Sequence, residues 1–499
     1  MTEQFDIVII GAGPGGYSTA LRAAQLGRQV ALIERDAAPG GTCLNRGCIP
    51  TKALLDATAT FDAIRHADGI GIHAHADPID FPTLHHWREN IVSTMVQGLS
   101  SLLAQRGVTV FQADAELMPA GETGTDDPNR RSVLLTPSTG QTDVLRHDAK
   151  TVSPQGARVV IETTDVVLAM GSRPRELPGT TFHDAIIDST QALQRDFPAS
   201  ATIIGAGAVA VEFASIWNSA GCDVTLVIRK DRVLSAWDRR AGTTLTRELR
   251  KRGITVIANA AVTRIESNTP NETTVYYRVK GGEEQSVASE AVLGAIGRDP
   301  NTQAAWVAGN GIDLDEHGHV VTDEYGRTRA AHVWAVGDIV AGHALAHRAF
   351  EQGITVAERI AGLDPKPVDE NTVPQVVFSR PQAACVGYSG AQAKADGRFG
   401  NVTETAYPMM GNARMAMSGS TGSMTIVSGE TADDPGTRVV LGVHMVSPEA
   451  TELIAEAEQL VGNRVPLSEA ARLIHPHPTF SETLGEALLK ADGRPLHTR

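Results

Sequence analysis

The sequence predicts an α/β protein with two Rossmann-like dinucleotide-binding domains followed by a C-terminal α+β domain. Two observations carry this prediction. A glycine-rich turn between a buried strand and a helix occurs twice, at residues 11–16 and 205–210, as in dinucleotide-binding βαβ units. Beyond residue 366, strands and helices alternate without a third such turn, which indicates a separate α+β architecture.

The composition limits the class of protein. A chain of 499 residues can form two or three domains, and its 42% hydrophobic and 20% charged residues are ordinary for a globular protein. The net charge of −14 argues against a nucleic-acid or anionic-membrane surface. No apolar run approaches the roughly 20 residues of a membrane helix, and the N-terminus lacks a secretory pattern. We therefore expect a cytoplasmic protein.

The first glycine-rich turn follows a continuous apolar strand, Phe5 to Ile10. Gly11, Gly13 and Gly16 form G-x-G-x-x-G at the start of a helix, and the next strand ends on Glu34, 23 residues after Gly11. Such glycines let the backbone approach a pyrophosphate at the helix N-terminus, and the acid accepts hydrogen bonds from a ribose diol. This context favours a dinucleotide site over a plain glycine turn.

Two of the four cysteines, Cys43 and Cys48, lie five positions apart in a glycine-rich stretch. On a regular helix their Cα atoms would be about 8–9 Å apart, whereas a disulfide needs roughly 4.4–6.8 Å. If they are bridged, the backbone between them is therefore irregular, and Gly47 permits such a path. Pro50 favours a helix start, which places Cys48 near a helix N-terminus that stabilises a thiolate.

A structural disulfide and half of a metal site are the alternatives for this pair. The first is disfavoured in a chain without a secretory signal, and the second because no partner Cys/His pair has finger-like spacing. We therefore expect a redox-active pair and no metal, and we expect Cys222 and Cys385 to be buried thiols.

The second glycine-rich turn, Gly205, Gly207 and Ala210, gives G-x-G-x-x-A between a strand and a helix. The count that reaches Glu34 from the first turn here reaches Ile228, and Arg229, Lys230 and Arg232 follow. An acid at this place binds the ribose 2′-hydroxyl of NAD, whereas arginine pairs with a 2′-phosphate. The residues therefore predict that NADP(H) is accepted, with Arg229 as the main phosphate contact, although solvated surface charges are the alternative.

Three further segments complete the chain. Residues 119–157 are polar and lack a clear period, which predicts a long surface excursion around short strands. A strand over 332–336 ends at Gly337-Asp338, and a helix follows from about 345 to 361. The chain ends with His475-Pro476-His477-Pro478-Thr479-Phe480-Ser481-Glu482.

Two dinucleotide motifs, a C-x-x-x-x-C and a terminal His-Pro with a nearby Glu together resemble the flavin-dependent pyridine-nucleotide disulfide oxidoreductases of class I. Within that family, residues 43–52 and the ending are most similar to the dihydrolipoamide dehydrogenases. The resemblance covers essentially the whole chain. The sequence departs from the family pattern at Met170 and Gln382 and in the length of 119–157.

The resemblance implies a role for each matching position. Cys43 would exchange with substrate, Cys48 would contact the flavin, and His477 would be the general base, oriented by Glu482. The residues expected at FAD are Gly11, Gly13, Gly16, Glu34, Gly41, Thr42, Lys52, Gly171, Asp338, Ala344, Leu345, Ala346 and His347. The residues expected at the nicotinamide dinucleotide are Gly205, Gly207, Ala210, Glu212, Ile228, Arg229 and Gly297.

The implied protein is a homodimer that oxidises dihydrolipoamide, carried on the lipoyl domain of a 2-oxoacid dehydrogenase-type complex, and passes electrons through FAD to NAD(P)+. The implied domains are FAD-binding (1–180 and 286–360), NAD(P)-binding (181–285) and dimerisation (361–499). An NADPH-dependent reductase of a glutathione- or mycothiol-type disulfide is one alternative. A flavin transhydrogenase or quinone reductase is another, and a non-catalytic scaffold fits poorly with so many reactive positions.

Overall fold

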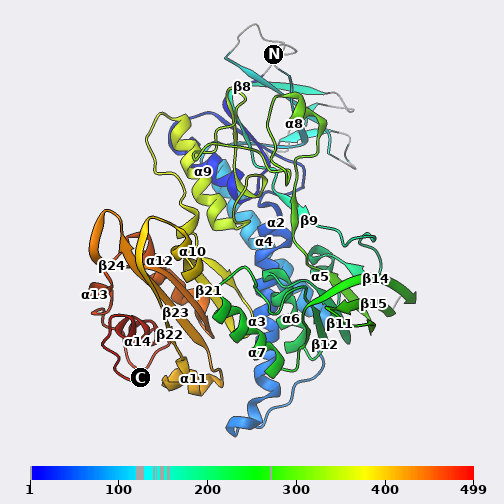
Figure 1. Cartoon of the computed structure of the whole chain (residues 1–499). Helices are drawn as coiled ribbons and strands as arrows, with labels where there is room; N and C mark the ends of the chain where they lie inside the picture. Colours follow the sequence, from blue (N-terminus) through cyan, green and yellow to red (C-terminus); the bar gives the residue numbers. More distant parts are fainter. Residues whose placement is uncertain are drawn as a thin grey trace. The chain divides into compact units, whose positions relative to one another are not determined.

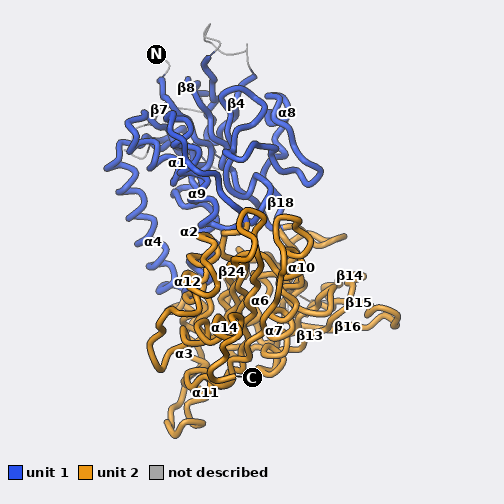
Figure 2. The backbone as a smooth tube through the Cα atoms, turned by 60° about the vertical axis from the view of Figure 1, so that its left-hand side comes forward, with its two compact units in different colours: residues 1–53, 85–174, 298–370 blue, residues 54–84, 175–297, 371–499 orange. Residues whose placement is uncertain are grey.

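The computed structural model describes residues 3–119, 129–138, 141, 143–146, 151–153, 158–269 and 272–498. Part of the excursion predicted at 119–157 therefore lies outside the described residues. The chain divides into two compact units, residues 1–53, 85–174 and 298–370 in the first and residues 54–84, 175–297 and 371–499 in the second (Figure 2). The expected division into FAD-binding, NAD(P)-binding and dimerisation domains stays a prediction.

Unit 1 is built on a nine-stranded sheet with a parallel centre. β1 (Glu3–Ile10) pairs in parallel with β2 (Val30–Glu34) and β8 (Val159–Leu168), β2 pairs with β3 (Thr109–Gln112), and β8 pairs with β19 (Val333–Ala335). The carboxyl halves of β1, β2 and β8 are apolar and buried, at residues 7–10, 30–33 and 166–168. Their carboxyl ends meet at one edge of the sheet, which is where ligands bind in open α/β folds.

Short antiparallel strands extend this sheet on both sides. β4 (Asp114–Leu117) and β5 (Arg131–Thr136) join it at β8, and β6 (Val144–Arg146) and β7 (Thr151–Ser153) join it at β3. The expected short strands of the 119–157 segment are thus present where that segment is described. A separate ladder joins β9 (Ser172–Pro174) to β18 (Arg298–Pro300).

The helices of unit 1 include α1 (Pro14–Gln25), α2 (Gly41–Arg46), α8 (Ala305–Gly309), the 3₁₀ turn η2 (Gly337–Ile339) and α9 (Ala346–Ile360). α1 and α9 pack against each other (Figure 2). Two helices continue from one unit into the other, α3 (Cys48–Arg65) and α4 (Phe81–Gln105). The short turn η3 (Glu370–Thr372) does the same.

Unit 2 contains a second parallel sheet, in the order β10-β17-β11-β12-β13. Its strands are β10 (Ile186–Ile187), β11 (Ser200–Ile204), β12 (Asp223–Val227), β13 (Thr255–Ile257) and β17 (Ala291–Gly294). Its helices are α5 (Ser189–Gln194), α6 (Ala208–Ser219) and α7 (Arg239–Lys251), and η1 (Ala67–Ile70) follows α3. An antiparallel sheet of β14 (Ala260–Thr269), β15 (Glu272–Val279) and β16 (Glu284–Ser289) completes this part.

The C-terminal part of unit 2 is an antiparallel sheet in the order β20-β21-β24-β23-β22, with α12 and α14 packed against it (Figure 1). Its strands are β20 (Gln375–Val377), β21 (Gln382–Gly387), β22 (Phe399–Tyr407), β23 (Ser423–Thr431) and β24 (Asp434–Ser447). Its helices and turns are α10 (Gly390–Ala395), η4 (Met409–Gly411), α11 (Ala413–Ser418), α12 (Ala450–Gly462), α13 (Leu467–Ala470) and α14 (Glu482–Ala491). The predicted fold class, two Rossmann-like regions and an α+β region, is confirmed.

Some elements differ from the expectation. The start of α7 at Arg239 was not predicted from the sequence: Asp238 caps the helix N-terminus by accepting a hydrogen bond from the amide of Ala241. α14 was not expected, since the sequence pattern at 482–491 was interpreted only as the chain ending. Gln382, a departure from the family pattern, accepts hydrogen bonds from the amide and hydroxyl of Thr451 at the start of α12, so it serves as a helix cap.

Candidate active site

The first glycine-rich turn is so tight that two of its glycines have no room for a side chain. Gly11 has φ +102°, and a Cβ atom there would lie 2.4 Å from the carbonyl oxygen of Ala169. A Cβ atom on Gly16 would lie 1.8 Å from the carbonyl oxygen of Gly11. Gly13 is the N-cap of α1 and makes no side-chain cap. The first amide groups of α1 are therefore presented to a ligand, which fits a pyrophosphate.

Glu34 is the last residue of β2 and is buried. Its carboxylate accepts hydrogen bonds from the amides of Ala12 at 2.9 Å and Asp36 at 3.1 Å. Burial raises the pKa of Glu34 and outweighs these two hydrogen bonds, which lower it. The acid is thus fixed beside the glycine-rich turn, where a ribose diol of a dinucleotide would need it.

Cys43 and Cys48 lie on two different helices, because Gly47 ends α2 with φ −145° and ψ −108° and α3 begins at Cys48. All four cysteines are described residues, and none of them is in a disulfide in this structure. The pKa of Cys43 is raised, first by its side-chain hydrogen bond with Cys48, then by burial and by the charge of Cys48, while Lys52 lowers it. Cys48 is the first residue of α3, and a helix N-terminus favours a thiolate.

The cysteine stretch touches the glycine-rich turn directly. Gly41 has φ +58°, and a Cβ atom there would lie 2.6 Å from the Cα atom of Gly13. Glycine at position 41 therefore lets the two backbones approach so closely. The structure therefore brings Gly41, Thr42 and the cysteine pair to the proposed FAD motif.

Asp338 lies in η2, just after β19, and belongs to a polar network. Its carboxylate accepts a hydrogen bond from Ser172 Oγ at 2.6 Å, and Arg298 Nε donates to the same Ser172 Oγ at 2.6 Å. Arg298 also donates to the carbonyl oxygen of Ser172 at 2.6 Å, and Gln352 accepts from the amide of Gly337 at 2.9 Å. Arg298 and Gln352 were not predicted from the sequence, where the only signal is the Gly297-Arg298 pair that follows a strand.

The remaining residues expected at FAD also lie in unit 1. Gly171 has φ +66° and its carbonyl oxygen accepts from the amide of Asn301. Ala344 precedes the N-cap Leu345, and Ala346 and His347 open α9. These residues, the glycine-rich turn, Glu34 and Asp338 all lie at or follow carboxyl ends of parallel strands, an arrangement that fits an extended dinucleotide such as FAD.

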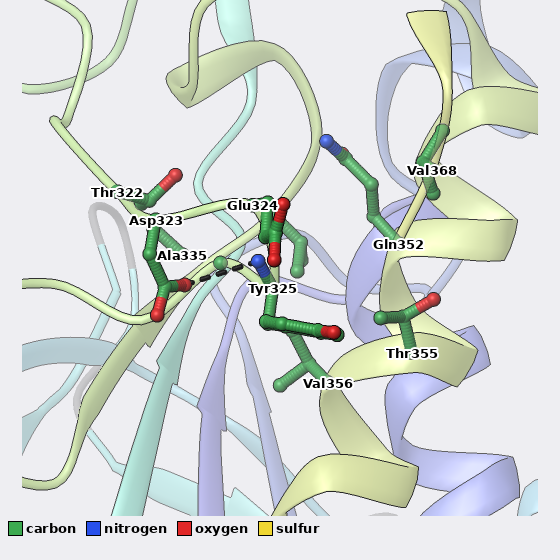
Figure 3. A pocket seen from close by; sticks show the side chains of 11 residues that line it. Thr322, Asp323, Glu324, Tyr325, Ala335, Gln352, Thr355, Val356 and Val368 are labelled. Carbon is green, nitrogen blue, oxygen red and sulfur yellow. Dashed lines mark hydrogen bonds between the residues drawn. The ribbon is translucent and has the colours of Figure 1, made fainter. Parts of the chain in front are cut away.

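A cavity of about 30 Å³ lies in the same unit, lined by residues that include Tyr325, Gln352, Thr355 and Val356 (Figure 3). Asp323 shapes one side of it by accepting a hydrogen bond from the amide of Tyr325 at 3.0 Å. Such a volume suits roughly one or two water molecules, so this cavity is not the dinucleotide site.

The second glycine-rich turn has the same backbone geometry in unit 2. Gly205 has φ +143°, and a Cβ atom there would lie 2.1 Å from the carbonyl oxygen of Ala295. Gly207 is the N-cap of α6, and Ala210 is fully buried on that helix. Gly297 has φ +131° and its nearest side chain is Arg175. The turn and the helix N-terminus fit a second dinucleotide.

Glu212, also expected at this site, is buried on α6 and accepts a hydrogen bond from the amide of Phe378 at 3.0 Å. Phe213 and Trp217 of α6 share one apolar core with Val377 and Val446 of the C-terminal sheet. One oxygen of Glu212 therefore connects the second dinucleotide-binding sheet to the C-terminal part of unit 2.

The strand end after the second turn lacks an acid and is basic. Ile228 is fully buried after β12, and Arg229 and Lys230 are exposed. Arg232 is paired with Asp231 at 2.8 Å and also donates to the carbonyl oxygen of Ser235. Arg229 makes no ion pair with any described residue, so it is available to an anionic ligand.

His477 and Glu482 form a hydrogen-bonded pair in unit 2. His477 Nδ1 lies 2.7 Å from Glu482 Oε1, and Glu482 Oε2 accepts from the amide of Thr479 at 2.8 Å. Burial raises the pKa of Glu482, but the hydrogen bonds from Thr479 and His477 and the charge of His477 outweigh it and leave the pKa lowered. The His477 ring is 79% exposed, so its Nε2 is accessible to a thiol from outside this chain.

A reducible cysteine pair in contact with a dinucleotide turn, on a chain with a second such turn, defines a disulfide oxidoreductase with two dinucleotide sites. A family model for pyridine nucleotide-disulphide oxidoreductases matches residues 5–353, and a model for that family's dimerisation domain matches residues 373–488. The chain belongs to the pyridine nucleotide-disulphide oxidoreductase family, as the sequence predicted. FAD and a nicotinamide dinucleotide are the cofactors of this family.

Several relatives match over the whole chain. A dihydrolipoyl dehydrogenase of Bacillus subtilis is 32% identical over 500 residues, with 100% of both chains covered. One of Chlamydia pneumoniae is 33% identical over 498 residues, covering 100% of this chain and 99% of the relative. The crystal structure of LpdA from Mycobacterium tuberculosis superposes with a TM-score of 0.83 at 27% identity and covers 98% of this chain and 100% of that one.

The comparisons also bear on the expected homodimer. The match at 373–488 is to a dimerisation domain, which agrees with a dimer. Within the part of the chain that the structure describes, no helix combines the length and the apolar character needed to cross a membrane.

Proposed function

We propose that this chain is a dihydrolipoyl dehydrogenase, which oxidises protein-bound dihydrolipoamide and transfers the electrons to a nicotinamide dinucleotide. The observation that carries the proposal is the pair of Cys43 on α2 and Cys48 at the start of α3, beside Gly41, whose backbone contacts the first glycine-rich turn. The dihydrolipoyl dehydrogenases among the relatives support this substrate. The His477–Glu482 pair supports general base catalysis on a thiol.

The cofactors would be held by the residues already located. In unit 1, the first glycine-rich turn and Glu34 would hold the ADP half of FAD. Asp338 would hold its ribityl part, and Lys52 would lie near the flavin. When bound, FAD accepts the two electrons of a dithiol and gives a hydride to the nicotinamide. The second glycine-rich turn would hold the nicotinamide dinucleotide.

The residues of the chain carry the thiol chemistry. In a neutral ring whose Nδ1 donates to Glu482, Nε2 is the free nitrogen that takes a proton from a substrate thiol. The substrate thiolate attacks Cys43 Sγ of the oxidised pair, the Cys43–Cys48 bond breaks, and its electron pair stays on Cys48. The second substrate thiol then attacks the substrate sulfur bound to Cys43. The substrate leaves as a disulfide and both cysteines are reduced.

The proposed assembly is a homodimer in the cytoplasm, in which His477 of one chain serves the cysteine pair of the other, and whose substrate is a lipoyl domain. The match to a dimerisation domain and the exposure of His477 support it. After subunit exchange, mixing inactive Cys43→Ser and inactive His477→Ala proteins should restore activity at one site per heterodimer. Fully active monomers at high dilution would contradict the dimer.

The central experiment is Cys48→Ser. We expect this variant to keep bound, yellow FAD and to lose dihydrolipoamide turnover, because serine at position 48 cannot form the disulfide with Cys43 that the substrate thiolate attacks. Steady-state rates with dihydrolipoamide, glutathione disulfide and mycothiol disulfide, each with NAD(H) and NADP(H), separate the proposed enzyme from a reductase of another small disulfide. Wild-type turnover by Cys48→Ser would end the proposal.

A second observation favours a departure from NAD. Ile228 cannot accept hydrogen bonds from a ribose diol, and Arg229 is exposed at the same strand end. We therefore propose that NADP(H) is accepted, with Arg229 as its phosphate contact.

A further inference from the structure

Ser172 lies between Arg298 and Asp338, and the direction of its hydrogen bonds follows from these two neighbours. Arg298 Nε can only donate, so Ser172 Oγ accepts from it at 2.6 Å. An ionised carboxylate can only accept, so the Ser172 hydroxyl donates to Asp338 Oδ2, also at 2.6 Å. The three side chains therefore form a relay, in which the guanidinium donates to the hydroxyl and the hydroxyl donates to the carboxylate.

The backbone around Ser172 holds this relay in place. Ser172 is buried, and its carbonyl oxygen accepts a second hydrogen bond from Arg298, from Nη2 at 2.6 Å. Asn301 holds the two preceding residues, since its side chain donates to the carbonyl oxygen of Met170 and its amide to that of Gly171, both at 2.9 Å. One short segment, which begins at Arg298, therefore positions the turn that carries Ser172.

Asp338 has one carboxylate oxygen in the relay and one outside it. Arg298 Nε lies 4.0 Å from Oδ2, too far for a hydrogen bond, so the donor to that oxygen is Ser172. Oδ1 makes no hydrogen bond with any described residue, and the Asp338 side chain is 26% exposed. The backbone of this turn is itself held, because the amide of Gly337 donates to Gln352 at 2.9 Å. Oδ1 is therefore available to a hydroxyl donor, and the relay fixes the orientation of the carboxylate.

We propose that Arg298 is a positioning residue of the FAD site. Through the Ser172 hydroxyl it orients Asp338, so that the second carboxylate oxygen accepts a hydrogen bond from a hydroxyl of the ribityl chain. Arg298 acts through Ser172 and need not touch the cofactor. Without the relay the carboxylate is free to rotate about its side-chain bonds, and ordering it again on binding lowers the affinity for FAD. This inference rests on the FAD site of the proposed function.

The test is Ser172→Ala in the holoenzyme. This variant removes the middle of the relay and keeps the bond from Arg298 to the carbonyl oxygen of residue 172, so the ladder of β9 and β18 stays in place. The measurement is the dissociation constant for FAD, from the FAD recovered in the ultrafiltrate of diluted holoenzyme. We expect this constant to rise about tenfold, as for the loss of one hydrogen bond to a charged group. Arg298→Met should raise it by a similar factor.

A double-mutant cycle shows whether Ser172 acts through the carboxylate. Asp338→Ala should also weaken FAD binding, and adding Ser172→Ala to it should weaken binding no further. Arg298→Met should likewise add nothing to Ser172→Ala. The matched control is Thr163→Val, which removes a buried hydroxyl of β8 that donates to the carbonyl oxygen of Asp165. This control should keep the wild-type dissociation constant.

A merely structural role of Arg298 predicts a different pattern. It predicts a lower thermal stability of Arg298→Met, together with a wild-type dissociation constant in Ser172→Ala. That outcome would overturn the inference, and so would an unchanged constant in Asp338→Ala or an effect of Ser172→Ala that is equal with and without the carboxylate. Because FAD binding needs no substrate, a holoenzyme that fails to oxidise dihydrolipoamide would instead count against the proposed function.

Discussion

The two glycine-rich turns share a backbone geometry and differ in what surrounds it. Gly11 and Gly205 both have positive φ, and a Cβ atom at either would meet a backbone carbonyl oxygen within 2.4 and 2.1 Å. The last position of the motif, however, is Gly16 in unit 1 and the buried Ala210 in unit 2. The next strand ends on Glu34 in the first case and reaches Ile228 in the second.

This difference separates two requirements. The first glycine fixes how the strand turns into the helix, so it is needed in both places. The residue at the strand end instead determines which polar group of the ligand can be bound, so it can differ between the sites of two dinucleotides. Position 16 is glycine for a local reason, since the Gly11 carbonyl oxygen occupies the place of its Cβ atom.

The largest expected effect comes from substituting a glycine of the first turn by alanine, with a glycine of the second turn as the comparison. Gly16→Ala should destabilise the protein by about 3 kcal/mol and abolish FAD binding, because its Cβ atom would lie 1.8 Å from a backbone oxygen. Gly207→Ala should keep the stability and the flavin, because a Cβ atom there meets no described atom within 4 Å. Thermal unfolding and flavin absorbance measure both effects. Equal stability losses in the two variants would break the comparison.

A smaller effect is expected at the basic strand end. Arg229→Ala should lower kcat/KM for NADPH by about 10- to 100-fold, the range expected from losing a charge-assisted hydrogen bond of about 1.5–3 kcal/mol. The value for NADH should be unchanged. Arg240→Ala, which removes an exposed arginine in the first turn of α7, is the matched control. A strong NADH preference that Arg229→Ala does not alter would show that the basic cluster is only surface.

The smallest effect concerns pH. The pKa of Glu34 is raised in the folded protein, chiefly by burial, so the folded state holds this proton more tightly than the unfolded state. The stability gained from Glu34 is therefore fully present below its unfolded pKa of about 4.3 and is lost as pH rises through its higher folded pKa. Denaturant unfolding of wild type and Glu34→Gln from pH 4 to 7 should show this loss only in wild type. An identical pH dependence of the two proteins would contradict it.

Much of the candidate site was predictable because its signals are local. The glycine turns, the cysteine spacing and the His477–Glu482 pair each lie within a short stretch, where spacing limits the backbone geometry. The start of α7 and the whole of α14 were not predicted, since one depends on a capping side chain and the other lacks a distinctive pattern. The expected roles of the site residues in binding and catalysis stay predictions that the variants above test.

By itself, the sequence determined which residues have reactive or ligand-binding chemistry, and that two dinucleotide-binding turns belong to one chain. Tertiary structure decided which distant residues meet. Ser172 contacts Arg298 and Asp338 across 126 and 166 positions, and the backbones of Gly13 and Gly41 touch. The physical reason is that such contacts follow from the register of parallel strands and from the close packing of backbones, which no local spacing in the sequence specifies.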